Sequence, residues 1–258
     1  MFQRNKEKGG SGLGLSPAST ATTTGPTDSQ RRKITVGLVG DDAVGKDSIL
    51  HRFRDGTQKV EYSSIVAEHY TKTVRLRDFI LDKDDYNDNN NNNNNSTTNP
   101  LKKKKMALDE EVDMMVWVVG GMDAYDTLRP GYYMLTDVVV LCYRVNRRNS
   151  FDRIKTKWLP DVSAYLPDTP KILLATQVDL REDEVALQKL QKVKENLVTT
   201  EEGRKLASDI DDGACDYMEC SAAKEEGLKE LFAEILILAL YPHKKPKRLS
   251  LPFLKKDK

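Results

Sequence analysis

The sequence lacks any hydrophobic run long enough to cross a membrane, which takes about 20 consecutive apolar residues. Cysteine is scarce, since Cys142, Cys215 and Cys220 are odd in number and widely spaced. We therefore expect reduced thiols of an intracellular protein, neither a disulfide framework nor a zinc site. An excess of charge of one sign is also missing, because 41 Lys and Arg residues balance 40 Asp and Glu residues. The net charge of +1 argues against a general nucleic-acid-binding protein.

Apolar clusters are missing from two segments, which we expect to lie outside the packed core. Residues 1–32 are rich in Gly, Ser, Thr, Gln and Lys, and predict a disordered leader without a signal-peptide core. Residues 82–108 contain an unbroken asparagine tract at 89–95 and lysines at 102–105. Such a segment cannot bury apolar surface, so we interpret it as a disordered, solvated insertion in the domain. Its lysines fit either a solubilising patch or a weakly anion-attracting one.

A glycine-rich loop follows the first apolar segment of the chain. Residues 34–39 are β-branched enough for a buried strand, and residues 40–47 read Gly-Asp-Asp-Ala-Val-Gly-Lys-Asp. Residues 48–53 can begin a helix. A strand, a glycine loop and a helix N-terminus together predict a phosphate-binding site, where backbone N–H groups and Lys46 hold the phosphates. The alternative is a glycine turn with an incidental lysine.

The last position of this loop departs from the general pattern, which is Gly, four residues, Gly-Lys and then Ser or Thr. Asp47 stands where a neutral hydroxyl would meet magnesium. It can ligate a hard cation, but its charge also faces the phosphates. Without a cation between them, two unit charges ~4 Å apart repel by about 4 kcal/mol at an effective dielectric near 20. Asp42 adds a second extra carboxylate, and both changes argue against an ordinary nucleotide site.

Strand-like and helix-like segments alternate along the rest of the chain. Further strands are predicted at residues 68–76, 112–119, 136–143, 171–175 and 216–218. Helices are predicted at residues 150–166 and 181–197, after a capping box at 199–202, and along an apolar stripe at 228–239. This alternation predicts an α/β fold, a doubly wound, mostly parallel sheet with ligands at the C-terminal ends of its strands.

Several segments resemble motifs of the Rho family of small GTPases. Residues 175–180, Ala-Thr-Gln-Val-Asp-Leu, resemble the Thr-Gln-x-Asp loop that reads guanine, and residues 219–222 match the Glu-Cys-Ser-Ala base loop. Residues 123–130 resemble the second switch, and residues 157–160 are a Lys-Trp-Leu-Pro motif of the family. The charged segment 181–197 resembles the insert helix that distinguishes Rho proteins from other small GTPases. We interpret Trp158 as a residue of core packing rather than of function.

The resemblance covers about residues 33–242 except the insertion, and implies a P-loop small GTPase fold with a six-stranded, mostly parallel sheet, flanking helices and a Rho-type insert helix. It implies GTP and GDP binding in the cytoplasm, with magnesium as the usual companion ion. Asp179 would accept hydrogen bonds from guanine N1 and N2, and Gly121 would offer its N–H near the terminal phosphate. The nucleotide-binding residues it implies are Asp42, Ala43, Val44, Gly45, Lys46, Asp47, Ser48, Gly121, Thr176, Gln177, Asp179, Ser221, Ala222 and Ala223, with Asp47 as the candidate metal ligand.

The sequence departs from the family at the groups that handle magnesium and water. Ile65 stands at the first-switch threonine, Val118 at the aspartate that holds magnesium through water, and Met122 at the glutamine that orients the attacking water. A thioether cannot orient that water, so we expect no catalytic residue and little hydrolysis. Gln58 replaces the aromatic residue that stacks on guanine, which weakens a stacking contribution of order 1 kcal/mol.

Three functions stay open for such a chain. The leading hypothesis is a Rho-like signalling protein with impaired magnesium binding, which binds effectors and regulators through two switch regions. These are residues 62–68, which begin at Tyr62, and residues 117–129, which begin at Trp117 and end at Arg129. The resemblance implies a role in actin or membrane signalling. The alternatives are a slow GTP-hydrolysing switch, in which Asp47 or Ser48 takes the magnesium, and a nucleotide-free scaffold.

The last residues, 243–258, are basic and contain no cysteine, so we expect no prenyl anchor. They fit either a soluble tail or a contact with an anionic membrane, worth about 1 kcal/mol per basic residue near the surface. We therefore expect a cytoplasmic protein that is at most peripheral to a membrane.

Overall fold

The computed structural model describes residues 31–57, 66–80, 109–210 and 215–241. Several predictions fall outside these ranges: the insertion, the basic tail, Gln58, Ile65 and most of the leader. Within the described ranges, no helix combines the length and the apolar character that a membrane crossing needs.

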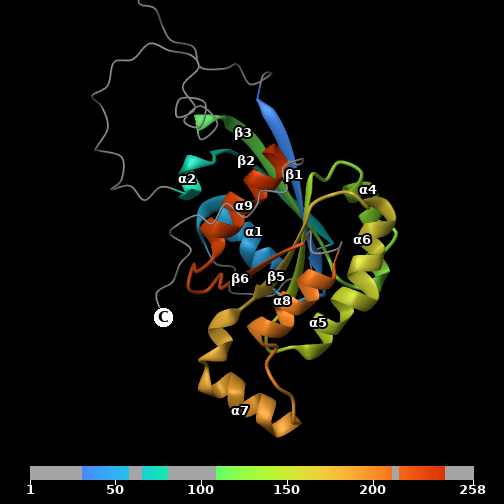
Figure 1. The fold of residues 1–258 in the computed structure, drawn as a ribbon, viewed down its shortest axis with the longest axis vertical. Coiled ribbons are helices and arrows are strands. Elements are labelled where there is room, and N and C mark those ends of the chain that lie inside the picture. Colours follow the sequence, from blue (N-terminus) through green and yellow to red (C-terminus); the bar gives the residue numbers. More distant parts are fainter. Residues whose placement is uncertain (1–30, 58–65, 81–108, 211–214, 242–258) are drawn as a thin grey trace, which may run out of the picture. The chain divides into compact units, whose positions relative to one another are not determined.

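Six strands form one mixed, mostly parallel sheet in the order β2-β3-β1-β4-β5-β6 (Figure 1). Only β2, at one edge, runs antiparallel to its neighbour. The strands are β1 (Arg32–Gly40), β2 (Ala67–Arg75), β3 (Glu111–Val119), β4 (Val138–Arg144), β5 (Lys171–Thr176) and β6 (Asp216–Cys220). This confirms the predicted sheet. Because β1 lies between β3 and β4, its C-terminal end is the point where the chain connections diverge, which is where α/β sheets place their ligands.

The central strands β1, β3, β4 and β5 are largely buried on both faces, because helices cover each side of the sheet (Figure 1), whereas edge strand β2 is mostly exposed. In β4, Val140 and Cys142 belong to one apolar cluster, and Leu141 and Tyr143 belong to the other. Helices α1 (Lys46–Asp55) and α9 (Leu228–Leu240) pack into the first cluster. The helices that pack into the second cluster are α4 (Arg129–Tyr133), the π-helical turn η3 (Ile154–Trp158), α6 (Leu159–Tyr165) and α8 (Thr200–Asp209).

The predicted helix at residues 150–166 is divided into three parts. Helix α5 (Arg148–Arg153) leads into η3, and η3 leads into α6. The π turn ends where Pro160, which has no backbone N–H to donate, enters α6. The end of the π turn therefore follows from the proline of the Lys-Trp-Leu-Pro motif.

The segment 181–197 is helical over a shorter range than predicted. A 3-10 turn, η4 (Val178–Arg181), comes first, and α7 (Glu184–Val193) follows it. Asp183 caps α7 by accepting from Val185 N and Ala186 N, and Lys194 ends it with a left-handed φ of 56°. The capping box of Thr199 with Glu202 is present at the start of α8, as predicted. Four short elements of the described residues were not predicted: α2 (Arg77–Ile80), η2 (Asp123–Tyr125), α4 and η4.

Candidate functional site

The predicted phosphate loop lies between β1 and α1, in the strand–loop–helix setting that the motif requires. Gly45 precedes α1 with a φ of 94°, where a side chain would be strained. Ala43 also has a positive φ of 58°, an uncommon conformation for a residue other than glycine. Asp47 and Ser48 lie half-buried in the first turn of α1. The loop thus combines a glycine-dependent bend with a helix N-terminus.

Lys46 closes the loop on itself. Its Nζ donates to the carbonyl oxygens of Gly40 at 2.7 Å and Asp41 at 2.6 Å, and only 4% of the residue is exposed. Burial lowers the pKa of Lys46, although Cys142 and the nearby aspartates act in the opposite direction. The ammonium group therefore lies inside the loop, where it can contact a bound anion with little water between them.

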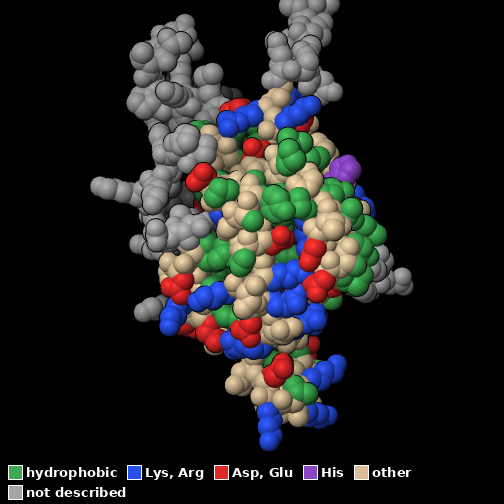
Figure 2. Space-filling model, turned by 90° about the vertical axis from the view of Figure 1, so that its right-hand side faces the viewer, with side chains coloured by type: hydrophobic (Ala, Val, Ile, Leu, Met, Phe, Trp, Pro, Cys, Tyr) green, Lys and Arg blue, Asp and Glu red, His purple; other side chains and the backbone are tan. Residues whose placement is uncertain are grey.

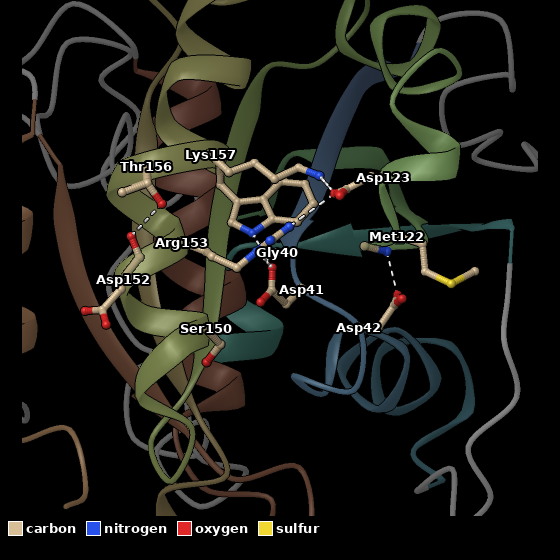
Figure 3. Close-up of polar contacts among 12 residues, drawn as sticks. Gly40, Asp41, Asp42, Met122, Asp123, Ser150, Asp152, Arg153, Thr156 and Lys157 are labelled. Atoms are coloured by element: carbon tan, nitrogen blue, oxygen red, sulfur yellow. Dashed lines mark hydrogen bonds and ion pairs between the residues drawn. The ribbon is translucent and has the colours of Figure 1, made fainter. Parts of the chain in front are cut away.

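Asp41 ties the loop to the neighbouring helix. Its Oδ1 accepts from Arg153 Nε and from Trp158 Nε1, both at 2.8 Å, and Figure 3 shows Arg153 and Asp41 pointing toward each other. Trp158 is 1% exposed and lies in the second apolar cluster, which confirms its predicted packing role. Its second role, as a donor to the loop, was not predicted, and neither was the contact of Arg153.

Asp42 reaches across to the end of β3. Its Oδ1 accepts from Gly121 N at 2.5 Å, a bond that appears in Figure 3 beside Met122. The backbones are also in direct contact, because a Cβ built on Gly121 would lie 2.4 Å from Asp42 N. The Asp42 carboxylate, which was predicted to disturb the loop, thus accepts from the Gly121 N–H. This N–H is the one expected near the terminal phosphate.

The two predicted base loops meet beside the phosphate loop. Ser221, which is fully buried, donates its Oγ–H to Asp179 Oδ1 at 2.6 Å and accepts from Lys224 N at 3.0 Å. This bond fixes the Asp179 carboxylate and leaves it capacity to accept from a ligand. Thr176 Oγ1 lies 2.5 Å from Val44 O and 3.0 Å from Tyr143 O. Segments far apart in the sequence are therefore brought to one place.

The remaining predicted residues surround this place. Gln177 follows β5 with a left-handed φ of 55°, and its Nε2 would lie 3.4 Å from a Cβ on Gly45. The carbonyl of Ala222 accepts from Arg52 Nε at 2.8 Å, and Ala223 is exposed. The backbone of this loop is thus anchored to α1.

The described residues do not supply a magnesium site of the usual kind. Val118 is 1% exposed and belongs to the first apolar cluster, so this position offers hydrocarbon instead of a carboxylate. Met122 is 43% exposed and carries only a thioether. Across residues 31–57, 66–80, 109–210 and 215–241, no group of three or more His, Cys, Asp and Glu side chains could hold a metal ion. Asp47 and Ser48 are left as candidate ligands, and without a carboxylate at the Val118 position the usual donor set for magnesium is incomplete.

The start of the second switch is held by charged contacts to η3 and α5. Asp123 Oδ1 accepts from Lys157 Nζ and, at 3.3 Å, from Arg153 Nη2 (Figure 3). The hydrogen bond from Lys157, with its positive charge, lowers the pKa of Asp123. Arg129, which is buried, donates to Met122 O at 2.9 Å. The contacts of Asp123 could not be predicted, because they join residues 30 and 34 positions apart in the sequence.

Trp117 is buried, so it cannot contact a partner protein at the surface. It is 1% exposed, although it begins the range expected to contact regulators. Its Nε1 donates to Thr136 Oγ1 at 3.1 Å, and its rings pack against Tyr132 and Tyr133. The buried indole therefore supports β3 from inside, and the exposed part of this range begins at Met122.

A comparison with protein-family models matches residues 83–240 to the Ras family. The matched span is more than half of the 258 residues, and it begins after the phosphate loop. Within it lie both base loops, with Asp179 and Ser221 in hydrogen-bond contact. Membership of this family implies GTP and GDP binding and a switching function. The sheet, the phosphate loop and the matched span together show that the chain belongs to the Ras family of small GTPases.

Proposed function

We propose that this protein is a Rho-like small GTPase that binds guanine nucleotides with impaired magnesium binding and little hydrolysis, and that signals through partner proteins. The observation that carries the proposal is the convergence of three loops. Thr176 Oγ1 reaches Val44 O in the phosphate loop, and three residues later Asp179 accepts from Ser221. A guanine nucleotide needs both parts of such a site, the phosphate loop for its phosphates and the loops of Asp179 and Ser221 for its base.

Two features support the Rho subfamily. Lys157 and Trp158 of the Lys-Trp-Leu-Pro motif contact Asp123 and Asp41, so the motif joins the second switch to the phosphate loop. Helix α7 lies in the segment between β5 and α8 where Rho proteins carry their insert. On this basis we propose residues 33–242 as one domain interrupted by the insertion 82–108.

The loss of metal and water chemistry is supported by Val118 and Met122. Positioning and metal charge contribute most of the catalysis in phosphoryl transfer. A buried valine cannot hold an ion, and an exposed thioether cannot orient a water molecule. We therefore infer that bound nucleotide persists without being cleaved at a useful rate.

Partner binding is proposed for the exposed part of the second switch and its surroundings. Met122, Leu128, Met134 and Leu135 are apolar and exposed. Figure 2 shows one side of the molecule, where hydrophobic side chains lie among charged ones of both signs. Such a mixed surface suits proteins better than nucleic acid. The expected contributions of residues 62–68 and of the basic tail, and with them a cytoplasmic or membrane-peripheral location, stay predictions.

Nucleotide titration of the full chain tests the proposal. Fluorescent GDP and GTP are titrated with magnesium and with a chelator, and phosphate release is followed in parallel. We expect binding that changes little on chelation, and no release above background. Asp179→Ala should weaken binding about tenfold or more, because guanine loses its acceptor. Asp168→Ala, which removes an exposed carboxylate at the other end of β5, should change nothing.

Tight, magnesium-dependent binding followed by turnover would contradict the proposal and support the slow hydrolysing switch. Release of phosphate that disappears in Lys46→Ala would confirm that the turnover belongs to this loop. Absence of binding by the native chain would support the nucleotide-free scaffold instead.

A further inference from the structure

We propose that Asp42 is a built-in competitor of the terminal phosphate, which makes this site select a guanine nucleoside diphosphate over the triphosphate. The inference rests on the proposed function, because it assumes that the loop binds guanine nucleotides, and it names the form of nucleotide that the site takes. The Asp42–Gly121 contact is observed in the structure, and the resemblance implies that the Gly121 N–H lies near the terminal phosphate.

The first step is the hydrogen bond itself. Asp42 Oδ1 lies 2.5 Å from Gly121 N, which is a short, charge-assisted contact. Gly121 offers one N–H, and that N–H is the group expected near the terminal phosphate. One N–H makes one strong hydrogen bond, so a phosphate oxygen and the Asp42 carboxylate cannot both have it. The carboxylate therefore holds the position that the third phosphate of GTP would need.

The second step is the lack of space around Gly121. A Cβ built there would lie 2.4 Å from Asp42 N and 2.5 Å from Asp41 C. The end of β3 therefore rests directly on the backbone of the phosphate loop. A third phosphate would have to displace the carboxylate and also separate two backbones that are in contact. A diphosphate, which is one phosphate shorter, needs neither change at Gly121.

The third step is that both sides of this contact are fixed by other parts of the protein. Arg147 Nη1 donates to the carbonyl oxygen of Asp42 at 2.9 Å. Asp41 is held by Arg153 and Trp158. On the other side, Arg153 and Lys157 hold Asp123, two residues beyond Gly121. These contacts hold the two backbones in place, so a third phosphate can take the Gly121 N–H only by turning the Asp42 side chain away and breaking its hydrogen bond.

The fourth step is charge. A triphosphate brings more negative charge to the loop than a diphosphate does, and it brings that charge toward Asp42. Lys46 is the buried cation of the loop, and it already donates to two carbonyl oxygens. Magnesium offsets such repulsion elsewhere, but Val118 offers it no carboxylate here. The repulsion from Asp42 therefore falls mainly on the third phosphate.

Competition binding separates the two nucleotides. Dissociation constants of GDP and of a non-hydrolysable GTP analogue are measured on the full chain by displacement of fluorescent GDP. The native protein should prefer GDP by about tenfold or more, which matches the loss of one charge-assisted hydrogen bond. Asp42→Ala should reduce this preference by about fivefold or more, chiefly by tightening the GTP analogue.

Two further variants refine the comparison. Asp42→Asn keeps the shape and an acceptor oxygen but removes the charge, so its preference should lie between those of the native protein and Asp42→Ala. This variant also keeps the test usable if Asp42→Ala does not fold. Asp168→Ala removes an exposed carboxylate near the start of β5, away from the loop, and should leave the GDP preference unchanged.

A readout without nucleotide tests the contact directly. The amide proton of Gly121 should resonate downfield in the NMR spectrum of the nucleotide-free native chain, and should move upfield in Asp42→Ala. The same chemical shift in both proteins would show that the bond is not formed, and would overturn the inference.

The outcomes distinguish the inference from the function on which it rests. If the native chain binds both nucleotides and the preference changes by less than about twofold in Asp42→Ala and Asp42→Asn, the inference is wrong and the proposed function stands. If the native chain and the variants bind neither nucleotide, the proposed function fails and the inference fails with it.

Discussion

Trp158 donates its indole N–H to Asp41 Oδ1 at 2.8 Å, across 117 residues of sequence. The bond places a core aromatic residue in contact with the phosphate loop. Arg129 stacks on the same indole, with its guanidinium carbon 4.7 Å from the ring centroid. Trp158 therefore links the loop, the second switch and the second apolar cluster through a single side chain.

Replacing Trp158 by Phe should lower the free energy of unfolding by about 1–3 kcal/mol, because the buried Asp41 carboxylate loses one of its two side-chain donors. Urea denaturation followed by circular dichroism measures this change. Tyr165→Phe, on an exposed ring, is the matched control. A loss below about 0.5 kcal/mol would mean that the indole packs without supporting the loop.

Restoring the glutamine alone should not restore hydrolysis. In Met122→Gln the new side chain can orient water, but Val118 still offers no carboxylate to a metal. We expect single-turnover phosphate release within about twofold of the native rate. A gain of about tenfold or more would show that the metal-free site is competent, and that only the water-positioning group was missing.

Arg181 should support the region where α7 begins. Its Nη1 and Nη2 donate to the two carboxylate oxygens of Glu219 at 2.7 and 2.9 Å, a bidentate pair. Arg181→Met should cost about 1–3 kcal/mol of unfolding free energy, because Glu219 keeps its charge and loses its cation. Hydrogen exchange should also speed up in α7. Arg204→Met, on the exposed side of α8, should leave both measurements unchanged.

Glu234 should make stability depend on pH. Burial, with a smaller effect of Asp216, raises its pKa from 4.5 to about 7. Between these values the unfolded chain releases the proton and the folded chain keeps it, so stability should fall as the pH rises and level off above about pH 7.

The variant Glu234→Gln removes this dependence. It should stabilise the protein by about 1–2 kcal/mol near pH 8, a figure reduced for the partial exposure of the residue, and by little near pH 5. Glu230→Gln, on the exposed side of the same helix, is the control and should show no such difference. Equal effects of Glu234→Gln at both pH values would contradict the raised pKa.

The centre of the sheet could be predicted from the sequence because its strands are apolar on both faces, which makes each of them stand out as a short run of apolar, mostly β-branched residues. Residues 112–119 and 136–143 show this, and they correspond to β3 and β4. The meeting of Asp179 with Ser221 could also be predicted, since each lies in a loop at the C-terminal edge of a parallel sheet.

The contacts of the phosphate loop could not be predicted. Asp42 and Gly121 are 79 residues apart, and their bond depends on the placement of two backbones within a few tenths of an ångström. Arg153 lies in a charged helical segment, where most side chains face solvent. The burial of Trp117 was missed for a similar reason, because a strand pattern alone does not show that Gly37 leaves room for its ring.

Thr176 Oγ1 lies within hydrogen-bond distance of both Val44 O and Tyr143 O. A hydroxyl carries a single proton, so it can satisfy only one of these carbonyls fully at any moment. The second acceptor is a ready alternative when the first moves away. The phosphate loop can therefore shift slightly without leaving a buried hydroxyl unpaired, because the Thr176 hydroxyl can donate to the sheet when it no longer donates to the loop.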